Sequence, residues 1–129
     1  MSPTRLTAAH CSICSSAAAC RSLFQPAELA GAIARTRGDS ALAEEMAKAI
    51  LVLPGVQWIA LDDALARRSA ELAARYRLRG ADAVYSAVAL THGCDLVSLD
   101  HEHLTRLATV VPTLTPTDAL TRLRAAGAQ

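Results

Sequence analysis

Residues 79–100, RGADAVYSAVALTHGCDLVSLD, decide the fold that the sequence predicts. After Gly80 the segment 81–91 is almost wholly apolar, and a helix that is apolar on all sides belongs in the interior of a protein. Gly93 ends this helix, and residues 95–99 then have the composition of a buried strand. A buried helix followed by a short buried strand is typical of an α/β protein.

The same alternation continues outward from this stretch. From Pro26 onward, glycine, proline and capping residues divide the chain into periodic segments. Strands that alternate with helices indicate an α/β fold with a mostly parallel sheet. We expect helices at 26–37, 39–53, 62–76, 81–91, 101–108 and 115–125, and strands at 20–24, 56–61, 95–99 and 110–114.

The composition limits the classes of function. A chain of 129 residues, 52% of them hydrophobic and 3% aromatic, is large enough for one domain with a core of Ala, Leu and Val. The net charge of +1 excludes a strongly basic nucleic-acid binder, so any contact with RNA or DNA must come from a local patch. No apolar run reaches the roughly 18 residues that a membrane span requires. We therefore expect a cytoplasmic protein that does not enter a membrane.

Residues 1–24 differ from the rest of the chain. They contain no Asp or Glu, are rich in Ala, Ser, Thr and Cys, and show no clean period before the short strand at their end. We therefore divide the chain into a divergent or misstarted segment at 1–24 and a domain at 25–125. The small residues between Arg5 and Cys20 also resemble a signal peptide with a lipobox, but polar residues interrupt its apolar centre and argue against that alternative.

Three cysteines lie in the N-terminal segment. Cys11 and Cys14 have the C-x-x-C spacing of zinc and redox motifs, with His10 and Cys20 near them. A zinc site needs an ordered knuckle and a redox pair needs a helix start after a strand, and the sequence predicts neither. The favoured interpretation is reduced thiols in a loosely structured segment, and a small zinc or redox protein is a remote alternative.

Two carboxylates stand where an unpaired charge is costly. Asp82 opens the apolar helix at 81–91, and Asp100 closes the strand at 95–99. Each can serve as a helix cap, but a shared divalent cation is a second explanation, because strand ends and helix starts meet at one edge of an α/β sheet. His101, beside Asp100, could carry protons but is more simply an exposed residue of a first helical turn.

In their order and context, three short segments resemble the motifs of one family. Gln25–Ala30 (QPAELA), Leu78–Ala83 (LRGADA) and Leu96–Asp100 (LVSLD) resemble the second, third and fourth acidic motifs of PIN domains. Residues 111–120 resemble the closing strand and helix of the family. Over residues 26–120 the chain therefore resembles a PIN domain, in particular the small bacterial ribonuclease toxins of the VapC type.

This resemblance implies a three-layer α/β/α fold and hydrolysis of RNA phosphodiesters that depends on Mg²⁺ or Mn²⁺. It makes Glu28, Asp82 and Asp100 the catalytic residues and metal ligands, whereas the pattern alone leaves open that Glu28 is an acid favoured by a helix dipole. Ser98 is either a support for a ligand carboxylate or a plain strand hydroxyl.

The resemblance also implies three partners: an RNA substrate, a cognate antitoxin and a second copy in a homodimer. The apolar faces of the helices at 27–37 and 39–53 are candidates for the two protein contacts. Arg75, Arg77 and Arg79 are candidates for contacts with RNA phosphates, although cations also suit an ordinary solvated helix end.

One departure from the family pattern concerns catalysis. The family begins with a central strand that ends in the first metal-binding Asp, whereas this chain has no acidic residue before Glu28. We therefore expect the first strand to be missing or divergent. The alternative to a ribonuclease toxin is a catalytically impaired PIN remnant that acts only as a partner-binding module.

Overall fold

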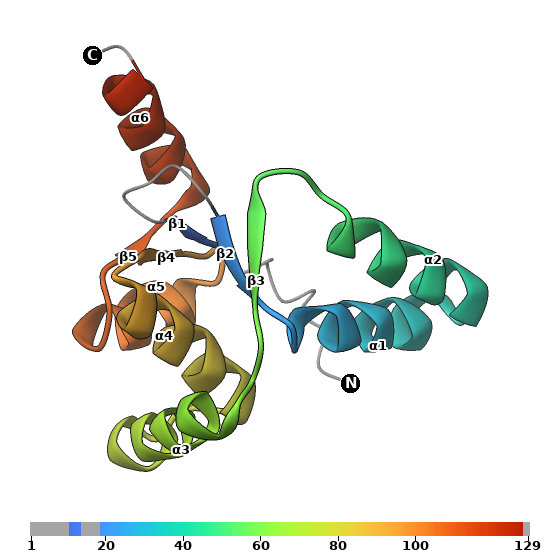
Figure 1. Cartoon of the computed structure of the whole chain (residues 1–129), viewed down its shortest axis with the longest axis horizontal. Helices are drawn as coiled ribbons and strands as arrows, with labels where there is room; N and C mark the ends of the chain where they lie inside the picture. The colour runs from blue at the N-terminus through green and yellow to red at the C-terminus, as the bar shows by residue number, and fades with distance from the viewer. Residues whose placement is uncertain (1–10, 14–18, 128–129) are drawn as a thin grey trace.

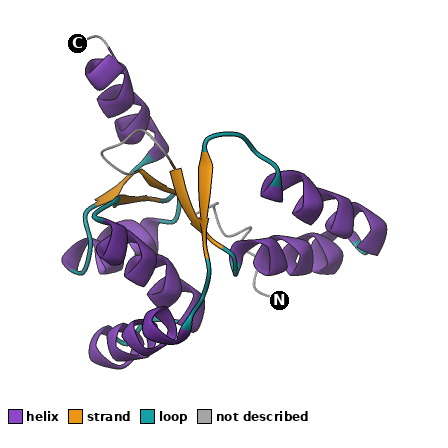
Figure 2. Cartoon of the chain, viewed as in Figure 1, coloured by secondary structure: helices purple, strands orange, loops and turns teal. Residues whose placement is uncertain are grey.

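The computed structural model describes residues 11–13 and 19–127, and within them helices surround a small sheet (Figures 1 and 2). The elements, in chain order, are β1 (Cys11–Ile13), β2 (Ala19–Ser22), α1 (Gln25–Arg37), α2 (Ser40–Leu51), β3 (Val56–Ile59), α3 (Asp63–Tyr76), α4 (Gly80–His92), β4 (Asp95–Val97), α5 (His101–Arg106), the 3₁₀ helix η1 (Leu107–Thr109), β5 (Thr113–Leu114) and α6 (Pro116–Gly127).

The sheet has the strand order β3-β2-β1-β4-β5. Strands β2 and β3 pair in parallel, as do β4 and β5, whereas β1 pairs antiparallel with both β2 and β4. Four strands therefore point in one direction and β1 alone points in the other. The predicted α/β class, with its mostly parallel sheet, is confirmed.

Strand β1 bears on two expectations about the start of the chain, and it decides that the first strand is divergent and not missing. It fills the central position between β2 and β4, so this position is not empty, although the strand there runs against its neighbours. The expectation of a loosely structured segment is wrong for Cys11–Ile13, which is a strand of the sheet, whereas the strand expected at 20–24 is present as β2. The zinc or redox alternative remains a prediction, because His10 and Cys14 lie outside the described residues.

Glycines and capping aspartates fix several helix ends at the positions that the sequence predicts. Gly38 and Gly93 end α1 and α4 with φ angles of 63° and 62°, a left-handed conformation that glycine adopts at little cost. At the starts of α2 and α3, Asp39 and Asp62 accept hydrogen bonds from backbone N–H groups at 2.9 and 2.8 Å, which satisfies donors that a helix start leaves unpaired.

Helix α4 is the centre of the hydrophobic core. Residues 83–89 are all buried, and the helix packs against α3, β2 and β4. This confirms the prediction of a buried helix. The core residues are Cys20, Leu65, Tyr85, Ala87, Val88, Ala89, Cys94, Leu96, Leu107 and Val111.

The chain path brings three element ends to one edge of the sheet. Helix α4 turns back through Gly93 into β4, so the start of α4 lies beside the end of β4. Strand β2 points in the same direction as β4 and leads into α1, so the start of α1 lies at that edge as well. Glu28, Asp82 and Asp100 are carried by these three ends.

Two predicted elements near the C-terminus are shorter than expected. The helix at 101–108 divides into α5 and η1, and the strand at 110–114 is reduced to Thr113–Leu114. The N–H groups of Val110 and Val111 both donate to the Leu107 carbonyl, at 2.9 Å, and proline has no N–H to offer at position 112. These residues therefore form a turn before the strand begins.

Helices α1 and α2 form a hairpin that stands apart from α3 and α4 (Figure 1). The two helices pack chiefly against each other. Within the described residues, no helix is long and apolar enough to cross a membrane. On the hairpin, on the segments that join it to the sheet and on the connection from β3 to α3, seven large apolar side chains are exposed: Leu23, Phe24, Met46, Leu51, Val52, Leu53 and Leu61.

Candidate functional site

Asp82 and Asp100 meet at the imidazole of His103. The Nε2 atom of His103 lies 3.0 Å from Oδ1 of Asp82 and 3.9 Å from Oδ2 of Asp100. The side chains of Asp82, Asp100 and His103 are only 16%, 13% and 9% exposed. Carboxylates that are this far removed from water need a compensating partner, and His103 supplies a hydrogen-bond donor to Asp82.

Ser98 holds the opposite side of the same ring. Its Oγ atom lies 3.0 Å from Nδ1 of His103 and accepts a hydrogen bond from the backbone N–H of Asp100 at 3.1 Å. In a neutral ring whose Nε2–H faces Asp82, Nδ1 accepts the Ser98 hydroxyl proton. Ser98 is buried, so this contact orients the ring in a site with little competing water.

Glu28 joins the other end of the site through Tyr85. The Tyr85 hydroxyl donates a hydrogen bond to Oε2 of Glu28, a residue 57 positions away. Tyr85 lies one helical turn after Asp82, so both side chains lie on the same face of α4. The site therefore combines two side chains of α4, the acidic residue in the first turn of α1, and the end of β4 with the start of α5.

The environment of Tyr85 is apolar and negatively charged. Burial raises the pKa of the Tyr85 phenol, and the hydrogen bond to Glu28 and the charges of Glu28 and Asp82 raise it further. Arg21, on β2, lies close enough for its positive charge to oppose part of this rise. The phenol consequently remains a hydrogen-bond donor throughout the neutral range.

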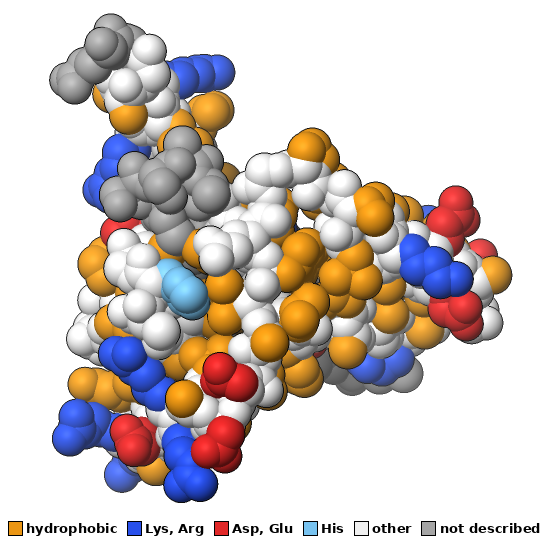
Figure 3. Space-filling model, in the orientation of Figure 1, with side chains coloured by type: hydrophobic (Ala, Val, Ile, Leu, Met, Phe, Trp, Pro, Cys, Tyr) orange, Lys and Arg blue, Asp and Glu red, His pale blue; other side chains and the backbone are white. Residues whose placement is uncertain are grey.

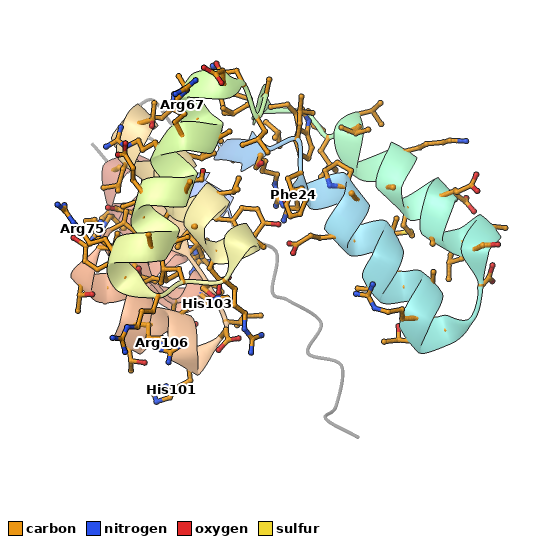
Figure 4. All side chains as sticks on the ribbon, turned by 90° about the horizontal axis from the view of Figure 1, so that it is seen from below. Phe24, Arg67, Arg75, His101, His103 and Arg106 are labelled. Atoms are coloured by element: carbon orange, nitrogen blue, oxygen red, sulfur yellow. The ribbon has the colours of Figure 1, made fainter. Side chains whose placement is uncertain are left out.

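The predicted RNA contacts lie on α3 and on the connection from α3 to α4. Arg75 is the one of them on the outer side of α3. It is at the outer edge of α3, on the side turned away from α1 and α2, whereas His103 lies nearer the middle of the molecule (Figure 4). Arg77 and Arg79 are exposed in the connection between α3 and α4, and Arg79 immediately precedes the helix that carries Asp82.

Two residues of the site were not anticipated from the sequence. His103 follows Asp100 by three positions and Tyr85 follows Asp82 by three, which is the spacing of side chains on one face of a helix. This spacing is the feature of the sequence that indicates His103 and Tyr85 as neighbours of the two carboxylates. His101, which the sequence offers as a proton carrier, is exposed, whereas His103 is buried.

The chemistry of the donors suits a hard divalent cation. Within the described part of the chain, no group of three or more His, Cys, Asp or Glu side chains is arranged to hold a metal ion. Mg²⁺ is, however, usually held by one or two carboxylates, with water and substrate phosphates as its other ligands. Asp82 and Asp100 are two carboxylates that face a common atom, the Nε2 atom of His103.

The comparison with protein families identifies the class. The PIN domain model matches residues 13–110, which is more than half of the chain. The chain therefore belongs to the PIN domain family, whose members are generally metal-dependent nucleases. No significant match was found among curated proteins or among solved structures.

Proposed function

We propose that this PIN domain is a metal-dependent endoribonuclease, and that it is the toxin of a toxin–antitoxin pair of the VapC type. One observation carries the nuclease part of the proposal. Two mostly buried carboxylates, Asp82 and Asp100, lie within 4 Å of one nitrogen atom at the edge of the sheet where Glu28 is also found. Family membership supports the same conclusion independently.

In this proposal Glu28, Asp82 and Asp100 are the residues that hold Mg²⁺ or Mn²⁺. When bound, such a cation neutralises charge on the RNA phosphate and makes water a stronger nucleophile. His103 donates to Asp82 and is itself held by Ser98, so both nitrogen atoms of its ring have a fixed role. The carboxylates are therefore held in place before substrate arrives, which is a condition for efficient catalysis.

RNA would approach the site from the exposed end of α4. Arg77 and Arg79 are solvent-exposed cations that precede this helix, and they suit contacts with phosphates on either side of the cleaved bond. Arg75 belongs to the same group in sequence, but it points to the outer side of α3 and is the weaker candidate. In this proposal base stacking contributes little to RNA binding, since aromatic residues make up only 3% of the chain.

The partner proteins in this proposal are a cognate antitoxin and a second copy of the chain. Their candidate surface is the apolar area on and beside the α1–α2 hairpin. Figure 3 shows hydrophobic side chains gathered between this hairpin and the centre of the molecule. Val52 is 80% exposed and Leu53 is 46% exposed. Apolar groups of this size, clustered rather than scattered, favour a protein contact.

The second candidate function is a catalytically impaired PIN domain that only binds its partner. One observation favours it: the sequence has no acidic residue before Glu28, so the first carboxylate of the family pattern is absent. The mostly buried Asp82–His103–Asp100 arrangement favours the enzyme instead, because a binding module has no need to keep costly carboxylates together.

Calorimetric titration with Mn²⁺ and Mg²⁺, beside an RNA cleavage assay on the same samples, tests the proposal. We expect Asp82→Asn and Asp100→Asn to lose both metal binding and cleavage. Asp118→Asn is the matched control, because Asp118 is an exposed acid in the first turn of α6. Metal binding without cleavage in the parent would support the partner-binding module. A folded parent that binds neither metal would refute the nuclease.

A further inference from the structure

We propose that Tyr85 is a positioning residue that holds the Glu28 carboxylate in its metal-binding place through a hydrogen bond from its hydroxyl group. This inference rests on the proposed function, since it assumes that Glu28 is a metal ligand. It adds a residue that acts through Glu28 and does not itself touch the metal or the RNA.

The hydrogen bond between Tyr85 and Glu28 connects helix α4 to helix α1. Tyr85 is 3% exposed and belongs to the core cluster, so its ring is fixed by packing. Glu28 is on α1, which packs chiefly against α2. Its long side chain can adopt several rotamers in the absence of a partner. The bond from Tyr85 to Oε2 of Glu28 therefore links a flexible carboxylate to the rigid helix that also carries Asp82.

The bond leaves the carboxylate able to act as a ligand. A carboxylate has two oxygen atoms with about four lone-pair sites, and one donor hydroxyl uses a single site. The Tyr85 hydroxyl also carries no charge, so it orients Glu28 without neutralising it, as a lysine or arginine would. Hydrogen bonds of this kind from outside the ligand set are a common feature of metal sites, and their removal typically lowers metal affinity by about 10- to 100-fold.

The surrounding charges favour a protonated donor. Burial and the neighbouring carboxylates of Glu28 and Asp82 all disfavour a phenolate, which would repel Glu28. A phenylalanine at this position would retain the packing while losing the donor.

The test compares Tyr85→Phe with Tyr76→Phe, since the chain has only these two tyrosines and Tyr76 is exposed. Mn²⁺ affinity is measured by calorimetry, and folding is checked by circular dichroism. We expect Tyr85→Phe to weaken Mn²⁺ binding by about 10- to 100-fold and Tyr76→Phe to leave it unchanged. In a Glu28→Ala background, Tyr85→Phe should have no further effect, because the carboxylate that it positions is gone.

A spectroscopic readout accompanies the affinity. In the Tyr76→Phe protein Tyr85 is the only tyrosine, so a change in the tyrosine bands of the difference absorption spectrum on Mn²⁺ addition reports on the surroundings of Tyr85. We expect such a change, and we expect Glu28→Ala to abolish it. A purely structural role for Tyr85 predicts lower stability with unchanged metal affinity.

The outcomes separate this inference from the proposed function. Parental Mn²⁺ affinity in folded Tyr85→Phe, with binding lost in Asp82→Asn, would overturn the role of Tyr85 and leave the nuclease intact. Equal losses from Tyr85→Phe in the parent and in the Glu28→Ala background would also overturn it, since the effect would not pass through Glu28. Metal binding that survives in Asp82→Asn and Asp100→Asn would instead refute the proposed function itself.

Discussion

Replacing His103 by alanine is predicted to destabilise the fold, because this residue joins the start of α4 to the end of β4. The change removes the hydrogen bond from Nε2 to Asp82, at 3.0 Å, and the contact of Nδ1 with Ser98, also at 3.0 Å. It leaves Asp82 mostly buried without this donor, and it leaves a space where a side chain that is 9% exposed was packed.

The magnitude follows from the two bonds. A hydrogen bond to a charged group contributes about 1.5–3 kcal/mol and one between neutral groups about 0.5–1.5 kcal/mol. We therefore expect His103→Ala to lower the free energy of unfolding by roughly 2–4 kcal/mol. For a domain of this size, that loss corresponds to a fall in Tm of roughly 6–16 °C.

Urea unfolding at neutral pH, without divalent metal, measures this loss. Fluorescence of the single tryptophan, Trp58, and circular dichroism report the transition. His101→Ala is the matched control, because His101 is exposed in the same helix, and its replacement should change stability by less than about 0.5 kcal/mol. If His103→Ala unfolds at the same urea concentration as His101→Ala, the two carboxylates are not held by this ring and the description of the site is wrong.

Two further predictions concern pH and backbone conformation. Because the pKa of Tyr85 is raised in the folded protein, only the unfolded chain loses this proton above about pH 10, so stability should fall with rising pH by up to about 1.4 kcal/mol per pH unit. Tyr85→Phe should flatten this alkaline slope in denaturant titrations, and an unchanged slope would contradict the raised pKa. Arg77 ends α3 with a φ angle of 55°, a conformation that favours glycine, so Arg77→Gly should stabilise the protein by about 0.5–1 kcal/mol in the same assay. A loss of stability would show that the arginine side chain makes a favourable contact that outweighs its backbone cost.

The helices could be predicted because local residues determine where they begin and end. Asp39, Asp62 and Gly93 act within one turn of the helix that each of them bounds. Strand β1 could not be predicted in this way. Its three residues are held by pairing with β2 and with β4, and β4 is more than 80 positions away along the chain. A strand that short shows no period of its own.

The candidate site was predictable to the extent that it follows motifs. Asp82 and Asp100 belong to segments that resemble family motifs, and the structure brings them to a common atom. The contacts that hold them depend on packing between distant segments. Tyr85 reaches a residue 57 positions away, and the place of His103 between the two carboxylates depends on how α5 returns toward α4. The Tyr85–Glu28 bond and the position of His103 between the carboxylates both depend on the packed core, so the local sequence does not indicate them.

The direction of β1 bears on how many carboxylates this site can have. In a sheet of parallel strands, residues that follow neighbouring strands converge at one edge, and such an edge is where ligands bind in α/β proteins. Because β1 runs against β2 and β4, its carboxyl end lies at the opposite edge from Asp82 and Asp100. The central strand therefore cannot deliver an acid to the site in the way that the family pattern requires, and the sequence has no acid before Glu28 to deliver. The carboxylates that the described residues bring to this edge belong to α1, to α4 and to the segment that follows β4. Under the proposed function, Glu28, Asp82 and Asp100 would therefore suit a single divalent cation completed by water and substrate phosphate better than the symmetric pair of cations of a two-metal site.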